Sequence, residues 1–279
     1  MKRKSFTILS VIGVTVLLSA FFLNNEIIFD STSNEIKKTK LDIVSLFNIY
    51  GFEDQFAMID GKKTWTNVQF SLMPENNELY SKLMPSPTEK TVVVYPFFTS
   101  IAYDEPGFYT YYRGECGDEC LTLDMSKDSV LNFFSSGNAF QVLTLLGYDS
   151  ISDIDIDKNP TILQNYDKVI LLHSEYVTKN EFDALTSHPN VIYLYPNALY
   201  AEIDVNYVTN KMTLVRGHGY PDANIANGFD WKFDNSPMEY NTNCTNMEFT
   251  KIDNGWMLNC YPERAIHQSK VLLDLIKDF

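Results

Sequence analysis

Continuous apolar runs of strand length mark the second half of the chain. Thr91 to Tyr95, Lys168 to Leu172 and Asn190 to Leu194 are each rich in valine, isoleucine and leucine. Such runs are typical of strands that are buried on both faces of a parallel sheet. Residues 179 to 187, between the last two runs, place apolar residues at helical spacing. This order predicts a βαβ unit, with the crossover helix covering one face of the sheet.

Start and turn signals refine this pattern. Thr178 and Glu181 have the spacing of a capping box for the crossover helix. Residues 201 to 215 alternate on both sides of a polar turn, which predicts an antiparallel hairpin. Asn254-Gly255 favours a second tight hairpin, and Pro262 is suited to the first turn of an amphipathic helix that ends near Phe279. The predicted fold class is α/β, with antiparallel hairpins added to a parallel sheet.

The N-terminus carries an uncharged apolar run from Phe6 to Leu23, close to the roughly 20 residues that a membrane-spanning helix needs. Lys2, Arg3 and Lys4 precede it, so the positive-inside rule places residues 1–5 in the cytoplasm and the body outside. A cleaved signal peptide is the alternative interpretation, since it shares the basic start and apolar stretch. We expect a single-pass signal-anchor in the cell membrane.

The rest of the chain divides by composition. Residues 24–40 are polar and read as a stalk, and residues 41–88 mix short apolar runs with turn formers, as a segment packed on the flank of the main domain would. Residues 89–279 contain the α/β pattern. The 45% hydrophobic content suffices for one core of ordinary domain size. A net charge of −14 excludes nucleic acid as a partner, because phosphate backbones attract basic surfaces.

Four cysteines suit an exported chain with two disulfides. Of the three possible connectivities we favour the local one, Cys116 with Cys120 and Cys244 with Cys260. A zinc site of four thiolates is the alternative, but it needs short paired spacings. Asn243 begins an Asn-Cys-Thr sequon for glycosylation.

A polar constellation follows the second apolar run. His173, Ser174, Glu175 and Tyr176 stand between a predicted buried strand and the capped helix. They are therefore expected at the carboxyl edge of a parallel sheet, where open α/β folds bind ligands. An imidazole, a carboxylate and a phenol there could bind a metal or transfer a proton. The structural alternative is that Glu175 caps the helix, His173 bonds a backbone carbonyl and Tyr176 packs.

The segment from Tyr166 to Thr178 resembles the strand and loop of the C-terminal domain of the N,N-dimethylformamidase large subunit family, whose pattern is approximately G-H-[DS]-E-Y-W-[ST]. Pro196 to Tyr200 and the following hairpin resemble the family's next elements. The resemblance implies a class I glutamine amidotransferase-like fold and amide hydrolysis with an iron held by tyrosines and a glutamate. Leu172 and Val177 depart from the family's glycine and tryptophan.

By this resemblance only Tyr176 can be carried over as a metal ligand. From the residues themselves, Glu175 is a second candidate ligand, and the ion is expected to be iron or zinc. A glutaminase nucleophile is missing. Residues 114–118 come nearest to its G-x-C-x-G elbow, but they lack the last glycine and a leading strand. Ser174 occupies an elbow position without the glycines that relieve such a turn. A serine hydrolase is therefore disfavoured.

Three more polar segments contain residues that could bind a ligand or an ion. Gly217-His218-Gly219 forms a tight turn after the first hairpin, and His218 would reach His173 and Glu175 if that hairpin folds over the sheet edge. Asn197 follows the neighbouring strand, so we expect it to share one shallow pocket with them, with Glu175 at an exposed position. Residues 153 to 157 alternate Asp with Ile. They lack the rest of a calcium loop, and we expect a solvated strand or loop.

Two functions remain. The first is a membrane-anchored extracytoplasmic domain that acts in binding or as an envelope-associated protein, with an envelope or carbohydrate-type ligand. The second is a metal-dependent hydrolase of amide or carbohydrate-linked substrates, with His173, Glu175 and Tyr176 as its catalytic residues and Ser174, Asn197 and His218 at the ligand.

Overall fold

The computed structural model describes residues 37–59, 61–125 and 131–279. The predicted span 6–23, the cytoplasmic tip and most of the predicted stalk lie outside these residues. Within them, no helix is long and apolar enough to cross a membrane. The last residues of the predicted stalk belong to the folded body. Lys38–Lys40 form β1, which pairs antiparallel with β2 (Asn48–Phe52).

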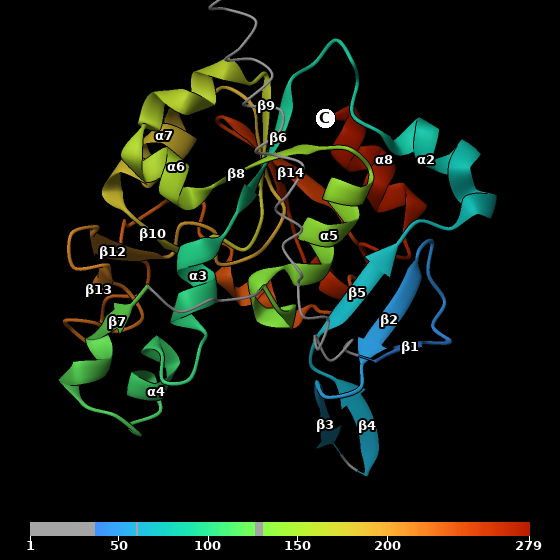
Figure 1. Cartoon of the computed structure of the whole chain (residues 1–279). Coiled ribbons are helices and arrows are strands. Elements are labelled where there is room, and N and C mark those ends of the chain that lie inside the picture. The colour runs from blue at the N-terminus through green and yellow to red at the C-terminus, as the bar shows by residue number, and fades with distance from the viewer. Residues whose placement is uncertain (1–36, 60, 126–130) are drawn as a thin grey trace, which may run out of the picture. The chain divides into compact units, whose positions relative to one another are not determined.

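A six-stranded, mostly parallel sheet forms the centre of the body (Figure 1). Its strands are β6 (Thr91–Tyr95), β8 (Asp149–Ser152), β9 (Lys168–Leu171), β11 (Val191–Tyr193), β14 (Phe249–Ile252) and β15 (Gly255–Leu258). The spatial order is β14-β15-β11-β9-β6-β8, and only β14 runs antiparallel to its neighbour. The predicted α/β class is confirmed at this level. The predicted βαβ unit is β9, α7 (Lys179–Ser187) and β11.

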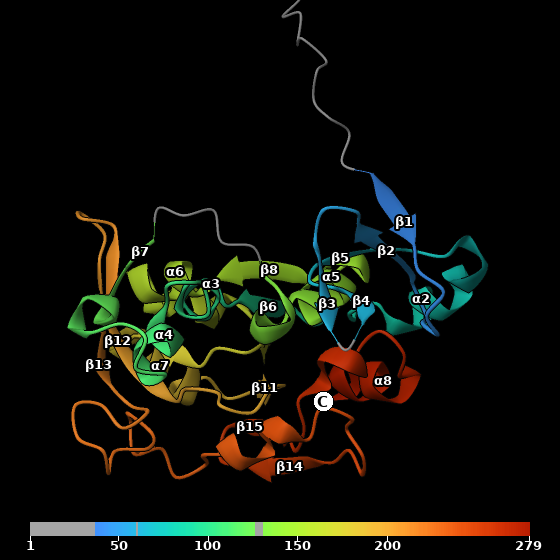
Figure 2. The ribbon, with the colours of Figure 1, turned by 90° about the horizontal axis from the view of Figure 1, so that it is seen from below.

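Helices cover both faces of this sheet. Figure 2 shows the sheet from its β14 edge to its β8 edge. Helices α6 (Asp153–Lys158) and α7 lie on one side of it, and α5 (Gly137–Leu145) and α8 (Lys270–Asp278) lie on the other. Alternate residues of each strand point to opposite faces, so neighbouring strand positions supply different cores.

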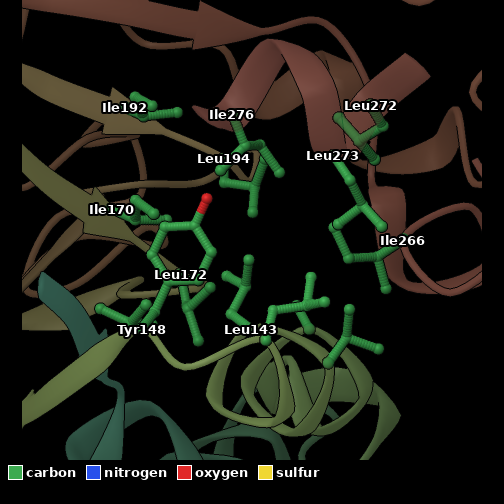
Figure 3. Packing of buried hydrophobic residues seen from close by; sticks show 14 of the residues in the cluster. Leu143, Tyr148, Ile170, Leu172, Ile192, Leu194, Ile266, Leu272, Leu273 and Ile276 are labelled. Atoms are coloured by element: carbon green, nitrogen blue, oxygen red, sulfur yellow. The ribbon is translucent and has the colours of Figure 1, made fainter. Parts of the chain in front are cut away.

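The core on the α5 and α8 side contains Ile170, Leu172, Ile192 and Leu194 from the sheet, packed against Leu143 and Ile276 (Figure 3). The opposite core takes Val169, Leu171, Val191 and Tyr193, packed against Ile156 and Leu185. Each fully buried Leu or Ile contributes about 1.5–3 kcal/mol relative to exposure. This two-sided burial explains why the strands read as continuous apolar runs.

The segment predicted to pack on the flank contributes to the first core. It contains β2, β3 (Phe56–Ile59), β4 (Lys62–Trp65), β5 (Val68–Ser71), η1 (Pro74–Asn76) and α2 (Asn77–Leu83). Strands β1, β2 and β5 form an antiparallel sheet, and β3 pairs with β4. Phe47, Ile49, Phe70 and Tyr80 are buried in the same cluster as the main sheet. Residues 37–279 form one compact unit.

A second sheet lies beyond the carboxyl edge of the first. It has the order β10-β12-β13-β7, from β10 (Tyr176–Val177), β12 (Ala201–Asn206), β13 (Lys211–Arg216) and β7 (Thr122–Asp124). The predicted hairpin of residues 201–215 is β12 and β13, and the second predicted hairpin is β14 and β15. Helices α3 (Phe97–Ala102) and α4 (Phe108–Tyr112) pack against this sheet. The remaining 3-10 turns are η2 (Asp118–Leu121), η3 (Phe133–Ser135), η4 (Pro160–Asn165), η5 (Ser236–Tyr240) and η6 (Pro262–Arg264).

Three local predictions are wrong. Residues 153–158 form helix α6 rather than a strand or loop, because Ser152 caps its start and Asp155 completes a capping box. Pro262 begins the separate turn η6, and α8 starts only at Lys270, where Ser269 accepts a hydrogen bond from Leu272 N–H. The cap of α7 is one-sided: Thr178 accepts from Glu181 N–H, whereas both carboxyl oxygens of Glu181 are buried without a hydrogen-bond partner.

Both disulfides have the predicted local pairing. Cys116 is bonded to Cys120, and Cys244 to Cys260. No cysteine is free. The thiolate zinc site and a nucleophilic Cys116 are therefore excluded, because both need an unbonded thiol. Asn243 is exposed beside the second disulfide, as a glycosylation acceptor must be.

Candidate functional site

The carboxyl ends of β6 and β9 carry the polar residues that come together in the fold. Among the five parallel strands, β6 is first along the chain and lies between β8, the second, and β9, the third. The chain therefore leaves β6 and β9 in opposite directions, which opens a crevice outside their ends. Thr99 and Tyr103 follow β6, and His173 and Glu175 follow β9.

Glu175 is the centre of this cluster, and its side chain has no solvent exposure. Its carboxylate accepts hydrogen bonds from the hydroxyls of Tyr103, at 2.7 Å, and Tyr109, at 3.1 Å, and from Nε2–H of His218. The expectation that Glu175 is exposed is therefore wrong, and so is the alternative that it caps α7. Three distant segments cover it instead.

Helix α3 fixes the backbone at this point. The Thr99 hydroxyl accepts from the N–H groups of Glu175 and Tyr176, at 3.0 and 3.2 Å. Tyr103 lies four residues later, and positions four apart share one face of a helix. Thr99 and Tyr103 therefore reach the same loop, and one contacts its backbone while the other contacts the Glu175 carboxylate.

Helix α4 brings further phenols. Tyr109 and Tyr112 are three residues apart and share a face, and the Tyr109 hydroxyl lies 2.9 Å from that of Tyr103. Tyr176 is buried, its ring stacks on His218, and its hydroxyl donates to Tyr112 at 3.5 Å. The phenols that hydrogen-bond to Glu175 thus come from residues 103 and 109, whereas the hydroxyl of Tyr176, the ligand expected from the resemblance, is directed at Tyr112.

His218 reaches Glu175 because its turn folds over the edge of the sheet. Its backbone has a φ of 52° and is flanked by Gly217 and Gly219, whose φ values are 128° and 79°. A Cβ on Gly217 would lie 2.9 Å from Cα of Ala201, so a side chain there would push the turn away from β12. The glycines therefore serve both the turn and the close approach that brings the imidazole to Glu175.

His173 is held in one orientation. Its ring Nδ1 lies 2.5 Å from the carbonyl oxygen of Phe134 and must carry the proton there, since a carbonyl only accepts. Its main-chain N–H donates to the hydroxyl of Ser136, and its ring stacks on Tyr195. Nε2 is buried without a hydrogen-bond partner, 3.5 Å from Oε2 of Glu175. With the ring proton on Nδ1, Nε2 has no hydrogen to donate, so Nε2 and the carboxylate oxygen are two acceptors that face each other without a hydrogen bond.

The charge states follow from burial and neighbours. Burial lowers the pKa of His173, although Glu175 opposes the effect, so the ring is neutral at pH 7. Burial would raise the pKa of Glu175, but the interaction with His218 outweighs it and the pKa is lowered, so the carboxylate is ionised. Burial, then the Glu175 charge, raises the pKa of Tyr103 and Tyr109. Both phenols are therefore protonated in the cluster as it stands.

A cavity of about 310 Å³ opens beside this cluster. Its lining residues include Tyr103, Tyr109, His173 and Glu239, the last of which belongs to η5. Asn197 does not line it, but its amide Nδ2 donates to Glu239. The backbone of the 197–201 turn contacts the loop of Glu175: the N–H groups of Leu199 and Tyr200 donate to the carbonyls of Ser174 and Glu175. Asn197 thus lies behind the cavity wall.

Ser174 has no catalytic geometry. Its side chain is buried, its hydroxyl has no hydrogen-bond partner, and its φ is not positive, as the strained turn of a serine elbow would require. In the described residues, no group of three or more His, Cys, Asp or Glu side chains is arranged to hold a metal. A metal at this site would therefore need phenol oxygens.

A larger hollow of about 470 Å³ lies between η4 and α7. His188 lines it, but both ring nitrogens face backbone carbonyls, those of Asn190 and Tyr166, at 3.1 and 3.0 Å. This histidine links two loops, and neither of its ring nitrogens is available to a ligand. The chemistry is concentrated at Glu175.

Sequence reasoning missed Thr99, Tyr103, Tyr109 and Glu239. The four tyrosines at positions 103, 109, 111 and 112 were a visible signal, since two of them have helical spacing. No sequence signal indicated that they lie opposite Glu175, because the segment that forms α4 matches no motif that would indicate its position in the fold. In comparisons with known proteins, the chain matches no family model and no curated protein.

Proposed function

We propose that this protein is a metal-dependent hydrolase of amide or carbohydrate-linked substrates, with Glu175, Tyr103 and Tyr109 as the metal ligands. The observation that carries the proposal is the convergence of two phenols and one buried carboxylate beside an unpartnered imidazole nitrogen. The strand order β8-β6-β9-β11-β15 is that of flavodoxin-like sheets, which supports the glutamine amidotransferase-like fold implied by the resemblance.

The donor set suits a small, hard cation. The Tyr103 hydroxyl lies 2.7 Å from Oε2 of Glu175 and 2.9 Å from the Tyr109 hydroxyl, which lies 3.1 Å from Oε1 of Glu175. Phenol and carboxylate oxygens are hard ligands of the kind that such a cation would prefer. Two phenols whose pKa is raised by burial and by a carboxylate ionise only beside a positive charge. The resemblance implies iron held by tyrosines and a glutamate, and the phenols that hydrogen-bond to the Glu175 carboxylate are those of Tyr103 and Tyr109.

The remaining groups provide proton transfer. A cation bound there would polarise a substrate carbonyl as a Lewis acid. His173 is neutral, with Nε2 free to take a proton from water, and the Phe134 carbonyl fixes its tautomer. The same nitrogen can then return the proton to the leaving amine or alcohol. His218 donates to Glu175 and holds its carboxylate in place.

Metal content separates this function from the binding or envelope-associated one. The full chain, purified in detergent, should hold close to one equivalent of iron or zinc. Tyr109→Phe and Glu175→Gln should lose it, while Tyr111→Phe, on the same helix, should retain it. Hydrolysis of a panel of amides should follow the metal content across these variants. A wild-type protein that stays metal-free after reconstitution with iron and zinc would favour the binding function.

The cellular setting of the proposal is extracytoplasmic. The apolar run 6–23 and the basic residues before it support an anchor in the cell membrane. Two disulfides in a chain of this size suit an oxidising compartment. A substrate from the envelope would be within reach of an enzyme held there.

A further inference from the structure

The cavity beside Glu175 has an aromatic lining. Six of its nine lining residues are phenylalanine or tyrosine: Tyr103, Tyr109, Phe133, Phe134, Tyr240 and Tyr261. Phe134 and Tyr240 stand at the rim and are 58% and 83% exposed, while Tyr261 is buried. Exposed rings next to a buried polar centre provide apolar contact for the body of a ligand.

The charge of the cavity is negative. Glu239 lines it, and Glu175 lies directly behind Tyr103 and Tyr109. The Glu239 carboxylate accepts from the neutral amide of Asn197, and within the described residues no Lys or Arg pairs with it. The unpartnered Nε2 of His173 adds another acceptor. The nearby guanidinium of Arg264 lies outside the lining, 5.6 Å from the centroid of Phe133.

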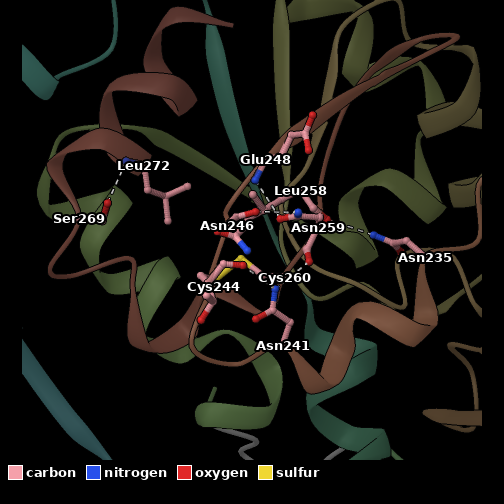
Figure 4. Close-up of a disulfide and its surroundings, with 11 residues drawn as sticks. Asn235, Asn241, Cys244, Asn246, Glu248, Leu258, Asn259, Cys260, Ser269 and Leu272 are labelled. Carbon is pink, nitrogen blue, oxygen red and sulfur yellow. Dashed lines mark hydrogen bonds between the residues drawn. A yellow bond between two sulfur atoms is a disulfide. The ribbon is translucent and has the colours of Figure 1, made fainter.

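The cavity wall is held before any ligand binds. Glu239, Tyr240 and Thr242 belong to a segment joined to the main sheet by the Cys244–Cys260 disulfide (Figure 4). The side chain of Asn241 donates to the carbonyl of Asn259, and its own carbonyl accepts from Tyr261 N–H. Glu239 and Tyr261 are therefore fixed on one rigid wall, and rigid walls reduce the entropy lost on binding.

We propose that this cavity binds an organic ammonium group carried on an apolar body, with Glu239 as the residue that selects the positive charge. Aromatic rings attract cations through their faces, and a half-buried carboxylate without a cationic partner gains an ion pair when the cavity fills. Carboxylate and phosphate ligands are disfavoured, since both Glu239 and Glu175 repel them. As a substrate class for the proposed hydrolase the inference rests on that function, but the binding itself needs no metal.

Three probes of one size test the charge preference. Benzylamine, benzyl alcohol and benzoate share a ring and differ in charge, so binding to chelator-treated full-length protein can be measured by calorimetry at pH 7. Benzylammonium should bind roughly tenfold or more tightly than benzyl alcohol, and benzoate should not bind detectably. Benzoate binding as tight as benzylammonium would overturn the inference.

Two matched variants identify the residue. Glu239→Gln keeps the oxygen that accepts from Asn197 and should make benzylammonium and benzyl alcohol bind equally, with an unchanged melting temperature. Glu248→Gln removes one exposed charge from the same segment and should keep the preference. Equal preference in Glu239→Gln and wild type would overturn the role of Glu239.

The same measurements keep the two proposals separate. Glu175→Gln, without metal, should still prefer benzylammonium, because Glu239 remains. If the wild type holds no metal and yet shows the preference, the hydrolase proposal fails and the ligand class stands. If the wild type holds the metal but shows no preference for benzylammonium, the proposed ligand class fails and the hydrolase proposal stands.

Discussion

At the residue scale, Glu175 shows how a buried charge is tolerated. Its carboxylate is removed from water, which costs free energy unless donors replace the lost hydration. Two tyrosine hydroxyls and one imidazole supply these bonds from α3, α4 and the turn after β13. Burial alone would raise the pKa of Glu175, but hydrogen bonds from His218 and Tyr103 help to lower it. The side chain therefore links stability to the candidate chemistry.

Glu175→Gln should lower the free energy of unfolding by about 1–3 kcal/mol. The glutamine amide has one acceptor oxygen and a donor NH2 group, so it cannot accept hydrogen bonds from all three donors. Urea denaturation at pH 7 measures the difference, and Glu248→Gln, an exposed glutamate, serves as the control. A loss below about 0.5 kcal/mol would contradict the burial of the carboxylate among three donors.

At the element scale, the start of α5 depends on a residue far along the chain. Glu263, on η6, accepts from Asn138 N–H at 2.5 Å, and its main-chain carbonyl accepts from the Asn138 side chain. Tyr195, which stacks on His173, donates to the other carboxyl oxygen. This one side chain therefore connects α5, η6 and the loop after β11. Burial raises the pKa of Glu263 to about 8, against 4.5 for a free carboxyl.

The raised pKa of Glu263 predicts a pH dependence of stability. A carboxyl that stays protonated in the folded chain but ionises in the unfolded chain contributes fully below about pH 4.5, and the contribution falls as pH rises towards about 8. Relative to Glu263→Gln, the wild type should lose up to about 1.4 kcal/mol per pH unit between pH 5 and 7. Parallel unfolding curves for the two proteins over this range would disprove the raised pKa.

At the scale of the whole molecule, the described body is one unit in which distant segments share cores. Phe47 and Phe70, from the first quarter of the chain, pack in the cluster that contains Leu272 and Ile276. The two disulfides are local by comparison, with separations of 4 and 16 residues. They stabilise the loops that border the candidate site rather than the sheet itself.

Removing each disulfide should therefore cost different amounts. The chain-entropy model gives about 3 kcal/mol for the loop closed by Cys244–Cys260 and about 2 kcal/mol for that closed by Cys116–Cys120. Double alanine variants under thermal or urea unfolding test this order. Labelling of the denatured, unreduced wild type should find essentially no free thiol, and four labelled cysteines would refute both bridges.

The membrane orientation is a prediction about the intact cell. With Lys2, Arg3 and Lys4 inside, added protease should digest the body and spare a short membrane fragment. A tag placed after Phe279 should be lost at the same rate as the body. Protection in intact cells with cleavage after lysis would show that the body is cytoplasmic.

The sequence by itself determined the local elements whose signals are short-range. Continuous valine and isoleucine runs predicted β6, β9 and β11, because both faces of these strands are buried. Alternation and Asn-Gly predicted the two hairpins, and even, closely spaced cysteines predicted both disulfides. The motif His173 to Tyr176 fell at the carboxyl edge of a strand. Each of these inferences needs only a few neighbouring residues.

Only the tertiary structure decided which side chains meet. Tyr103 and Tyr109 reach Glu175 because α3 and α4 cross the end of β9, and His218 reaches it because a glycine turn lies against β12. Alternating Asp and Ile at 153–157 fits a strand, but capping by Ser152 and burial of Ile156 beneath the sheet stabilise a helix. The three hydrogen bonds to Glu175 join residues that are 43 to 72 positions apart, and contacts at such separations leave no periodic trace in a single sequence.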